Sequence, residues 1–339
     1  MFLIVFSTVL LILNIYCFTR KKYLYLFIPC MLLLPNYYGF QIYWLPVLSV
    51  TRIMFLVFYF YSYINRRRDF DLRNFSFKKF PRYYSLLALY FALRIISNLY
   101  YVTTYIQAIK TILLIIFEQL LLLIAIYYLM PRSEEQFTLI KAIVWSATAV
   151  SLCAIAESFT SYRIFDNLYT VSKAMLNERY VRLGLLRSTA TFGLPTLFGN
   201  ACLLVFPLVL YLYEKTRYKR YLLCSLVFVF AVIHSGCRSD MLFLIFTTGI
   251  YALQYIKDIQ RLKLLTKNII TIIIISGIII GILSSVSPKY AYFYSGTGKS
   301  VLNSVGFDLP IEEETAPEGV EGYGEILMEQ NPELCCYPD

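Results

Sequence analysis

The chain has 339 residues, of which 59% are hydrophobic and only 15% are charged, and its mean hydropathy is +0.63. These values lie far from the averages of soluble proteins and exclude an ordinary pair of soluble domains. The formal charge is +10. Because membrane proteins concentrate Lys and Arg in their cytoplasmic loops, this basicity does not indicate nucleic-acid binding. We expect an all-α protein, a polytopic transmembrane helical bundle.

Apolar segments long enough to cross a hydrocarbon core of roughly 30 Å recur along the chain, separated by short polar breaks. The sequence predicts ten of them, at about 1–18, 23–38, 43–64, 83–101, 111–130, 137–157, 194–213, 220–236, 240–256 and 268–287. The first segment has neither a basic start nor a small-residue cleavage site, so we expect no cleavable signal peptide. Residues 1–287 are therefore expected to form the transmembrane domain.

The charge divides sharply along the chain. The part up to Ser300 carries a formal charge of +20, whereas the remainder carries −10 and has no Lys or Arg. A Pro-, Glu- and Gly-rich composition of this kind is typical of disorder. We expect residues 288–339 to form an acidic extracytoplasmic tail, either disordered or the beginning of a truncated outer loop.

Lys and Arg are also divided unequally between alternate loops. One set of loops holds 19 of these residues and the other set holds nine. The positive-inside rule places the first set in the cytoplasm. The amino terminus, the long 158–193 loop, Arg238 and the tail are then predicted to lie on the outer face.

Three charged residues fall inside predicted spans: Arg52, Arg94 and Glu118. Charges in hydrocarbon are costly and are normally buried against protein or face water. Arg94 and Glu118 each lie about 10 Å below the predicted outer end of their span, at about 1.5 Å per residue. We predict that these two residues form a structural ion pair, with a direct role in substrate binding as the alternative.

The 158–193 loop combines cations with aromatic rings, among them Arg179, Tyr180 and Arg182. Guanidinium groups bind phosphate through paired hydrogen bonds, and rings stack on sugar faces. The composition is therefore typical of a site for a substrate that carries phosphate and sugar. It fits equally well an amphipathic helix at 173–187 that lies on the membrane surface.

Other kinds of chemistry have little support. His234 is the only histidine, which excludes metal sites built from several histidines and favours a structural hydrogen-bonding role. The motifs of metal and serine hydrolases are absent from the sequence. The string from Ser295 to Ser300 is similar to the end of a phosphate-binding loop, but Phe293 stands where the first glycine is required. Most of the eight cysteines lie inside predicted spans and form no disulfide framework.

Two short motifs on the predicted outer face carry a resemblance to a known family. The first is Arg187-x-x-Ala190-x-Phe192-x-x-Pro195-Thr196, and the second is Ser235-Gly236-Cys237-Arg238. Over about 180–250 the chain resembles the O-antigen ligase and polymerase superfamily of bacterial membrane proteins, which shows an arginine before a span and a Ser-Gly-Ser-Arg-like turn before the next one. Alanine for glycine, threonine for asparagine and cysteine for serine are departures from the family pattern.

The resemblance implies a glycosyl transfer in the assembly of a cell-envelope polysaccharide. An acceptor hydroxyl attacks the anomeric carbon of a polyprenyl-diphosphate-linked oligosaccharide, and the diphosphate leaves. Preorganised arginines stabilise the charge on the leaving group without a metal or other cofactor. Arg187 and Arg238 are the residues that match the family motifs, with Arg182 as a third candidate.

Further roles follow by position. The substrate-binding candidates are Arg179, Tyr180 and Arg182, with Glu178 and Asp240 as outer-face carboxylates near the motifs, either of which could serve as a base. Gly193, Pro195, Ser235 and Gly236 are expected to be structural.

The resemblance places the protein in the bacterial inner membrane, in contact with lipid and other polysaccharide-assembly proteins. Family ligases have around twelve spans and a late outer loop with a functional histidine, so this chain is expected to be truncated or to be a divergent polymerase-like member. A transporter that flips a lipid-linked glycan is the alternative function, because it explains the basic outer loop and the buried charges equally well.

Overall fold

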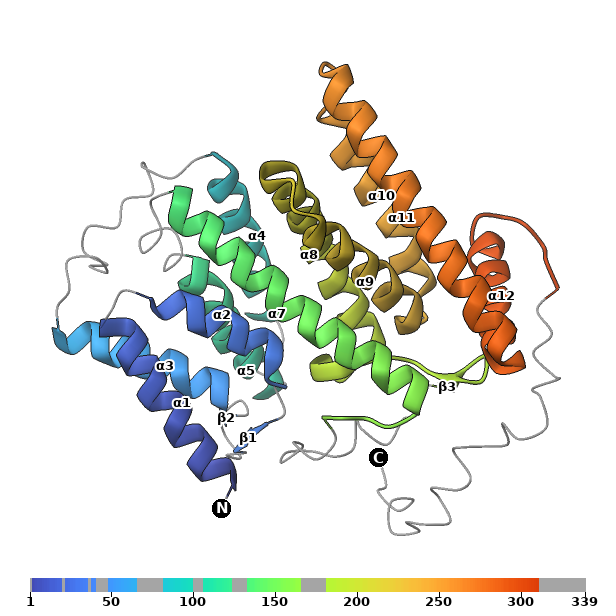
Figure 1. Ribbon diagram of the computed structural model, residues 1–339. Helices are drawn as coiled ribbons and strands as arrows, with labels where there is room; N and C mark the ends of the chain where they lie inside the picture. The colour runs from blue at the N-terminus through green and yellow to red at the C-terminus, as the bar shows by residue number, and fades with distance from the viewer. Residues whose placement is uncertain are drawn as a thin grey trace, which may run out of the picture. The chain divides into compact units, whose positions relative to one another are not determined.

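The computed structural model describes residues 2–19, 22–35, 38–40, 48–65, 82–99, 106–123, 133–165 and 181–310 (Figure 1). The chain forms two compact units, Met1–Ala142 and Ile143–Asp339. This division differs from the expected one at residues 287 and 288. Each unit is described by itself below.

The first unit is a set of apolar helices. They are α1 (Phe2–Thr19), α2 (Tyr23–Leu33), α3 (Val50–Asn65), α4 (Arg82–Leu99) and α5 (Ile106–Leu114), and α5 continues into the π-helical turn η4 (Ile115–Leu120). Two short strands, β1 (Gly39–Phe40) and β2 (Leu48–Ser49), pair antiparallel just before α3. The α1 helix packs on α2 and α3, and α4 packs on α5.

The second unit is built on α7, α8 and α9. Its helices are α7 (Ser133–Thr160, here from residue 143), η7 (Ala190–Phe192), α8 (Pro195–Thr216), α9 (Lys219–Ser235), α10 (Arg238–Leu253), α11 (Ile259–Val286) and α12 (Pro288–Asn303). A hairpin of β3 (Val181–Arg182) and β4 (Leu185–Leu186) precedes η7. The α8–α9 pair forms the centre of the core, where Val209, Phe228 and Ala231 are fully buried.

Local sequence signals set the residues at which α8 and α9 begin and end. Pro195 is the first residue of α8, where its missing N–H costs nothing. Arg217 ends α8 in the left-handed conformation, and α9 begins two residues later. Gly236 ends α9 in the same conformation, which glycine adopts without a steric penalty.

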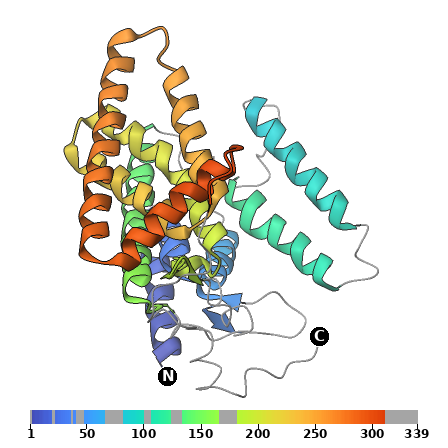
Figure 2. The same ribbon diagram turned by 90° about the vertical axis from the view of Figure 1, so that its right-hand side faces the viewer.

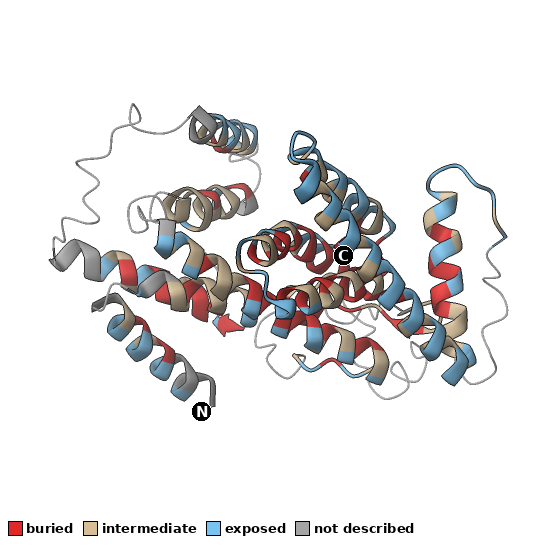
Figure 3. Cartoon of the chain, turned by 45° about the horizontal axis from the view of Figure 1, so that its top comes forward, coloured by how far each residue is buried: buried red, intermediate tan, exposed pale blue. Residues whose placement is uncertain are grey.

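Within the described residues, three helices are long and apolar enough to cross a membrane: Glu134–Thr160, Pro195–Thr216 and Ile259–Val286. Exposed residues predominate along α11, of whose most apolar stretch only 11% is buried (Figure 3). Its exposed isoleucines include Ile270, Ile273, Ile274, Ile278 and Ile282. An apolar surface of this extent marks contact with a membrane or another apolar partner. The other expected spans correspond to shorter helices or extend beyond the described residues, so ten spans remain a prediction.

Two segments differ from the sequence-based expectation. Residues 181–186 form the β3–β4 hairpin and not part of an amphipathic helix at 173–187, which was one of two equally weighted interpretations of this loop. Residues 166–180 lie outside the described part of the chain. Residues 288–303, expected in the disordered tail, form α12, which packs on α11 and β4. Figure 2 shows α11 with α10 joined to one end and α12 to the other. Residues 311–339 of the expected tail also lie outside the described part.

Candidate functional site

The β3–β4 hairpin positions two of the predicted arginines. Its two turn residues, Leu183 and Gly184, have positive φ angles of 50° and 76°, as in the tight turns that favour hairpins. Leu183 packs closely on Gly296 of α12, where an added Cβ would lie 2.8 Å from its Cδ1. Leu185 is buried against Phe293. Because both the turn and one strand are anchored in this way, the hairpin holds its flanking side chains in fixed directions.

Arg187 and Arg182 both reach the turn between α9 and α10. The Nε of Arg187 donates to the carbonyl of Ser235 over 2.9 Å, and its terminal nitrogen donates to Cys237 Sγ over 3.0 Å. Arg182 donates to the carbonyl of Gly236 over 2.5 Å and to Ser300 Oγ over 2.7 Å. The last carbonyls of a helix lack intrahelical partners and carry partial negative charge, so they suit guanidinium groups. We call residues 235–237 the arginine-held turn.

The turn is closely packed around Arg187. An added Cβ at Gly236 would lie 3.1 Å from Arg187 Nε, and Gly236 has a φ of 64°, so both space and backbone conformation require glycine here. Burial raises the pKa of the Cys237 thiol, an effect that Arg187 partly opposes. Cys237 therefore meets Arg187 as a neutral thiol at physiological pH.

Arg238 behaves differently from Arg187. It is the first residue of α10, its side chain is exposed, and it makes no hydrogen bond or ion pair with any residue that the structure describes. The two family-like motifs thus meet at one turn but contribute in different ways. The Arg187 guanidinium supports the turn, whereas the Arg238 guanidinium extends from it.

Asp240, a candidate for the base, is buried at the start of α10. It is 2% exposed, and its Oδ1 accepts from Ser239 Oγ over 3.4 Å. Its Oδ2 has no hydrogen-bond partner among the described residues and lies against Gly199 of α8, where an added Cβ would be only 1.9 Å away. In this arrangement Asp240 lies between the start of α10 and α8, and its role as a base stays a prediction.

A buried carboxylate that the sequence analysis missed holds the segment before α8. Glu157 of α7 is 1% exposed, and its Oε2 accepts from the backbone N–H of Ala190 over 2.9 Å. Its Oε1 accepts from the N–H of Ile164 over 3.2 Å. Ala190 has a φ of 45°, a conformation that is costly for a residue with a Cβ and that these contacts help to maintain. A carboxylate at the end of an apolar run, 137–157, was the sequence signal for this role.

His234 links three helices in the core beside the arginine-held turn. Its Nδ1 lies 2.9 Å from Ser158 Oγ of α7, and its Nε2 lies 3.0 Å from the Tyr294 hydroxyl of α12. The ring is fully buried and contacts the rings of Phe159 and Phe293. Buried polar groups in such a network are stabilising only when all are hydrogen-bonded. His234 is thus a structural hydrogen-bonding residue in this structure.

The remaining predicted residues divide into two groups. Gly193, with a φ of 74°, and Pro195 form the transition from η7 into α8, which fits their expected structural role. Glu178, Arg179 and Tyr180 lie outside the described residues.

The predicted pair of Arg94 with Glu118 is wrong. Glu118 pairs with Arg52 of α3, and Arg94 of α4 donates to Gln119 Oε1 over 3.1 Å. The physical reason is the π-helical turn η4, whose wider winding changes the direction of successive side chains. As a result Glu118 faces α3 and Gln119 faces α4. A cavity of about 360 Å³, lined mainly by apolar side chains such as those of Phe55 and Phe117, lies beside the Arg52–Glu118 pair.

Comparison of the chain with protein-family models, curated proteins and solved structures found no match.

Proposed function

We propose that the protein is a membrane-embedded glycosyltransferase of the O-antigen polymerase or ligase type, acting on a polyprenyl-diphosphate-linked glycan. The observation that carries the proposal is the arginine-held turn. Arg187 is engaged with the turn itself, whereas Arg238 extends from it, exposed and without an ion pair among the described residues. A cation without a protein partner at the start of a helix suits an anionic ligand such as a diphosphate.

The chemistry places the three arginines in distinct roles. The acceptor hydroxyl forms a new bond to the anomeric carbon and gives its proton to a base, for which Glu178 and Asp240 are the candidates. The bond from that carbon to the diphosphate oxygen breaks, and negative charge develops on the departing diphosphate. Arg238 stabilises this charge through paired hydrogen bonds, because its guanidinium extends from the turn and offers several donors to the diphosphate oxygens. Arg187 and Arg182 are positioning residues that hold the turn from which Arg238 extends.

The proposal includes a topology. Ten spans cross the inner membrane of a bacterium, with the amino terminus, the arginine-held turn and the carboxyl-terminal tail outside the cytoplasm. Three helices long and apolar enough to span support a membrane location. The partners in this arrangement are the lipid-linked oligosaccharide, membrane lipid and other polysaccharide-assembly proteins.

Glycan analysis of cells tests the proposal. In cells that lack the native gene, plasmids supply the wild type, Arg238→Lys or Arg238→Gln, and glycan ladders are compared at equal membrane levels of the protein. Loss of a preorganised donor lowers turnover by roughly a hundredfold or more, so long chains should disappear with glutamine and be strongly reduced with lysine. Lys289→Gln, which removes a cation at the start of α12, is the matched control and should keep the ladder. A normal ladder with Arg238→Gln would refute the role of Arg238.

The same gels separate the two reaction types. Loss of long chains with a single repeat retained on the final acceptor indicates a polymerase, because repeats are still transferred but not joined. Accumulation of lipid-linked polymer indicates a ligase, because joining continues and the last transfer fails.

A transporter of lipid-linked glycan is the second candidate. It is favoured by the Arg52–Glu118 ion pair beside the apolar cavity of about 360 Å³ in the first unit. Purified protein in liposomes distinguishes the functions: a fluorescent lipid-linked oligosaccharide should be elongated or transferred by an enzyme, and should change leaflet without a new glycosidic bond if the protein is a transporter.

A further inference from the structure

One end of the second unit carries a dense group of exposed cations. They lie at two turns, one between α8 and α9 and one between α10 and α11, and on the helix ends that flank these turns. The cations are Lys215, Arg217, Lys219, Arg220, Lys257, Arg261, Lys263 and Lys267, and all of them are exposed. Only two acids, Glu214 and Asp258, occur within 214–220 and 257–267. We call these eight side chains the basic turn surface.

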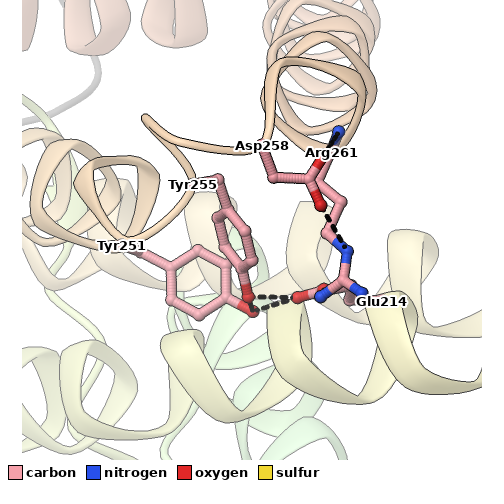
Figure 4. A network of polar contacts seen from close by, with 5 residues as sticks. All are labelled: Glu214, Tyr251, Tyr255, Asp258 and Arg261. Carbon is pink, nitrogen blue, oxygen red and sulfur yellow. Dashed lines mark hydrogen bonds and ion pairs between the residues drawn. The ribbon is translucent and has the colours of Figure 1, made fainter.

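A carboxylate network joins the two turns. Glu214, near the end of α8, accepts at Oε2 from the hydroxyls of Tyr251, over 3.1 Å, and of Tyr255 (Figure 4). Its Oε1 lies 3.5 Å from a terminal nitrogen of Arg261 on α11. One side chain of α8 thereby holds both the end of α10 and the start of α11.

The second acid is engaged in the same network. Asp258 caps α11 by accepting from the Arg261 backbone N–H over 3.2 Å, and its Oδ2 lies 3.0 Å from Arg261 Nε. Arg217, Tyr255 and Arg261 also line one small cavity together with Glu214, which shows that the two turns meet. Because both acids are engaged with Arg261 and the tyrosine hydroxyls, they neutralise few of the cations that the two turns bring together.

Aromatic rings lie beside these cations. The Arg220 guanidinium is 4.7 Å from the centroid of the Tyr218 ring and 6.0 Å from that of the Trp145 ring. Both rings are exposed, Tyr218 by 57% and Trp145 by 46%. Tyr218 lies between α8 and α9, and Trp145 lies within α7. Exposed Tyr and Trp next to Arg are typical of the level at which membrane head groups lie.

We propose that the basic turn surface binds the head groups of anionic phospholipids. Clusters of four to eight Lys and Arg next to apolar helices attract anionic lipid, and guanidinium groups bind phosphate in a paired geometry. A lipid is favoured over a soluble anion because the cations stand at the ends of α8 and α11, two helices apolar enough to lie in hydrocarbon. The site is separate from the arginine-held turn, and its occupancy does not depend on the proposed glycosyl transfer.

The first test compares lipids and charges. Full-length protein is placed in nanodiscs of phosphatidylcholine, with or without phosphatidylglycerol, and bound phosphatidylglycerol is counted by native mass spectrometry. The triple variant Arg217→Gln/Lys219→Gln/Lys263→Gln should bind phosphatidylglycerol about tenfold or more weakly at low salt. The triple variant Lys141→Gln/Lys289→Gln/Lys299→Gln removes the same charge from α7 and α12 and should bind as the wild type does. Equal losses in both triple variants would overturn the proposal.

The second test asks whether the network organises the site. Glu214→Gln raises the net charge by one, so diffuse attraction predicts tighter binding of phosphatidylglycerol, whereas an organised surface predicts weaker binding because the turns separate. We expect weaker binding, and a smaller decrease for Tyr255→Phe, which keeps the charge and removes the hydrogen bonds of the Tyr255 hydroxyl to Glu214 and Tyr251. Tighter binding by Glu214→Gln would overturn the proposal, as would protection from unfolding in detergent by inorganic phosphate that equals the protection by phosphatidylglycerol.

Discussion

Arg187 donates its Nε–H to the carbonyl of Ser235 over 2.9 Å, and this contact joins the two motifs that resemble the O-antigen polymerase and ligase families. The contact lies at the end of α9, three residues before Arg238, whose exposed guanidinium is proposed to meet the substrate. In this geometry Arg187 supports the turn and Arg238 is exposed, although each is the arginine of one of the two family-like motifs.

The different roles of the two arginines predict different effects on stability. Arg187→Lys should destabilise the protein by about 1–3 kcal/mol, because a lysine cannot keep both the Ser235 carbonyl and Cys237 Sγ satisfied. Arg238→Lys should change the free energy of unfolding by no more than about 0.5 kcal/mol, as expected for an exposed residue. Thermal unfolding of both variants in the same detergent measures the difference. Equal stability of the two variants would contradict the division of roles.

We predict that the Asp240 carboxylate leaves no room for a side chain at position 199. Gly199→Ala should destabilise the protein by about 1–3 kcal/mol, because the new methyl group would overlap Oδ2. The same change in an Asp240→Ala background should cost much less, and a double-mutant cycle measures this coupling. Gly249→Ala on α10 is the matched control, since an added Cβ there meets nothing within 4 Å. It should be neutral or stabilising. Additive effects of Gly199→Ala and Asp240→Ala would show that the close approach is not the cause.

His234 is predicted to contribute to stability through two hydrogen bonds. His234→Phe leaves Ser158 and Tyr294 unpaired in the core and should cost several kcal/mol, at about 1–3 kcal/mol for each buried group. Tyr294→Phe should cost less, because it removes only one partner. Tyr290→Phe on the same helix is the control, since its hydroxyl makes no hydrogen bond with the described residues. Similar thermal midpoints for the Tyr294 and Tyr290 variants would contradict the network.

The Arg52–Glu118 pair can be tested by charge reversal. Arg52→Glu and Glu118→Arg should each lower the yield of folded protein, because each places two like charges together among apolar side chains. The double variant should recover most of that yield, as measured by size-exclusion chromatography of a fluorescent fusion. Arg94→Glu combined with Glu118→Arg should give no recovery, because Arg94 contacts Gln119 instead. Recovery in that second combination would support the pair that the sequence had predicted.

Sequence patterns located the site better than they described its contacts. The motifs at Arg187 and at Ser235–Arg238 were identified through the resemblance to a known family, and the structure brings them to one turn. The pairing of Arg94 with Glu118 failed because it assumed regular α-helical winding, whereas a π-helical turn redirects the two side chains. The place of Glu157 at the end of an apolar run marks it in the sequence, but its contacts could not be predicted because its partners are backbone N–H groups, which have no signature in the sequence.

Composition and hydropathy were sufficient to indicate a helical chain with candidate membrane-spanning segments. The tendency of an apolar segment to enter a membrane depends on how many apolar residues it contains and not on their tertiary neighbours. Which polar groups meet was decided only by the tertiary structure. The hairpin at 181–186, the helix at 288–303 and the contacts of Arg182, Arg187 and His234 all depend on surfaces that come together from distant parts of the chain. Directional hydrogen bonds form only after packing has set those surfaces in place, so local sequence could not specify them.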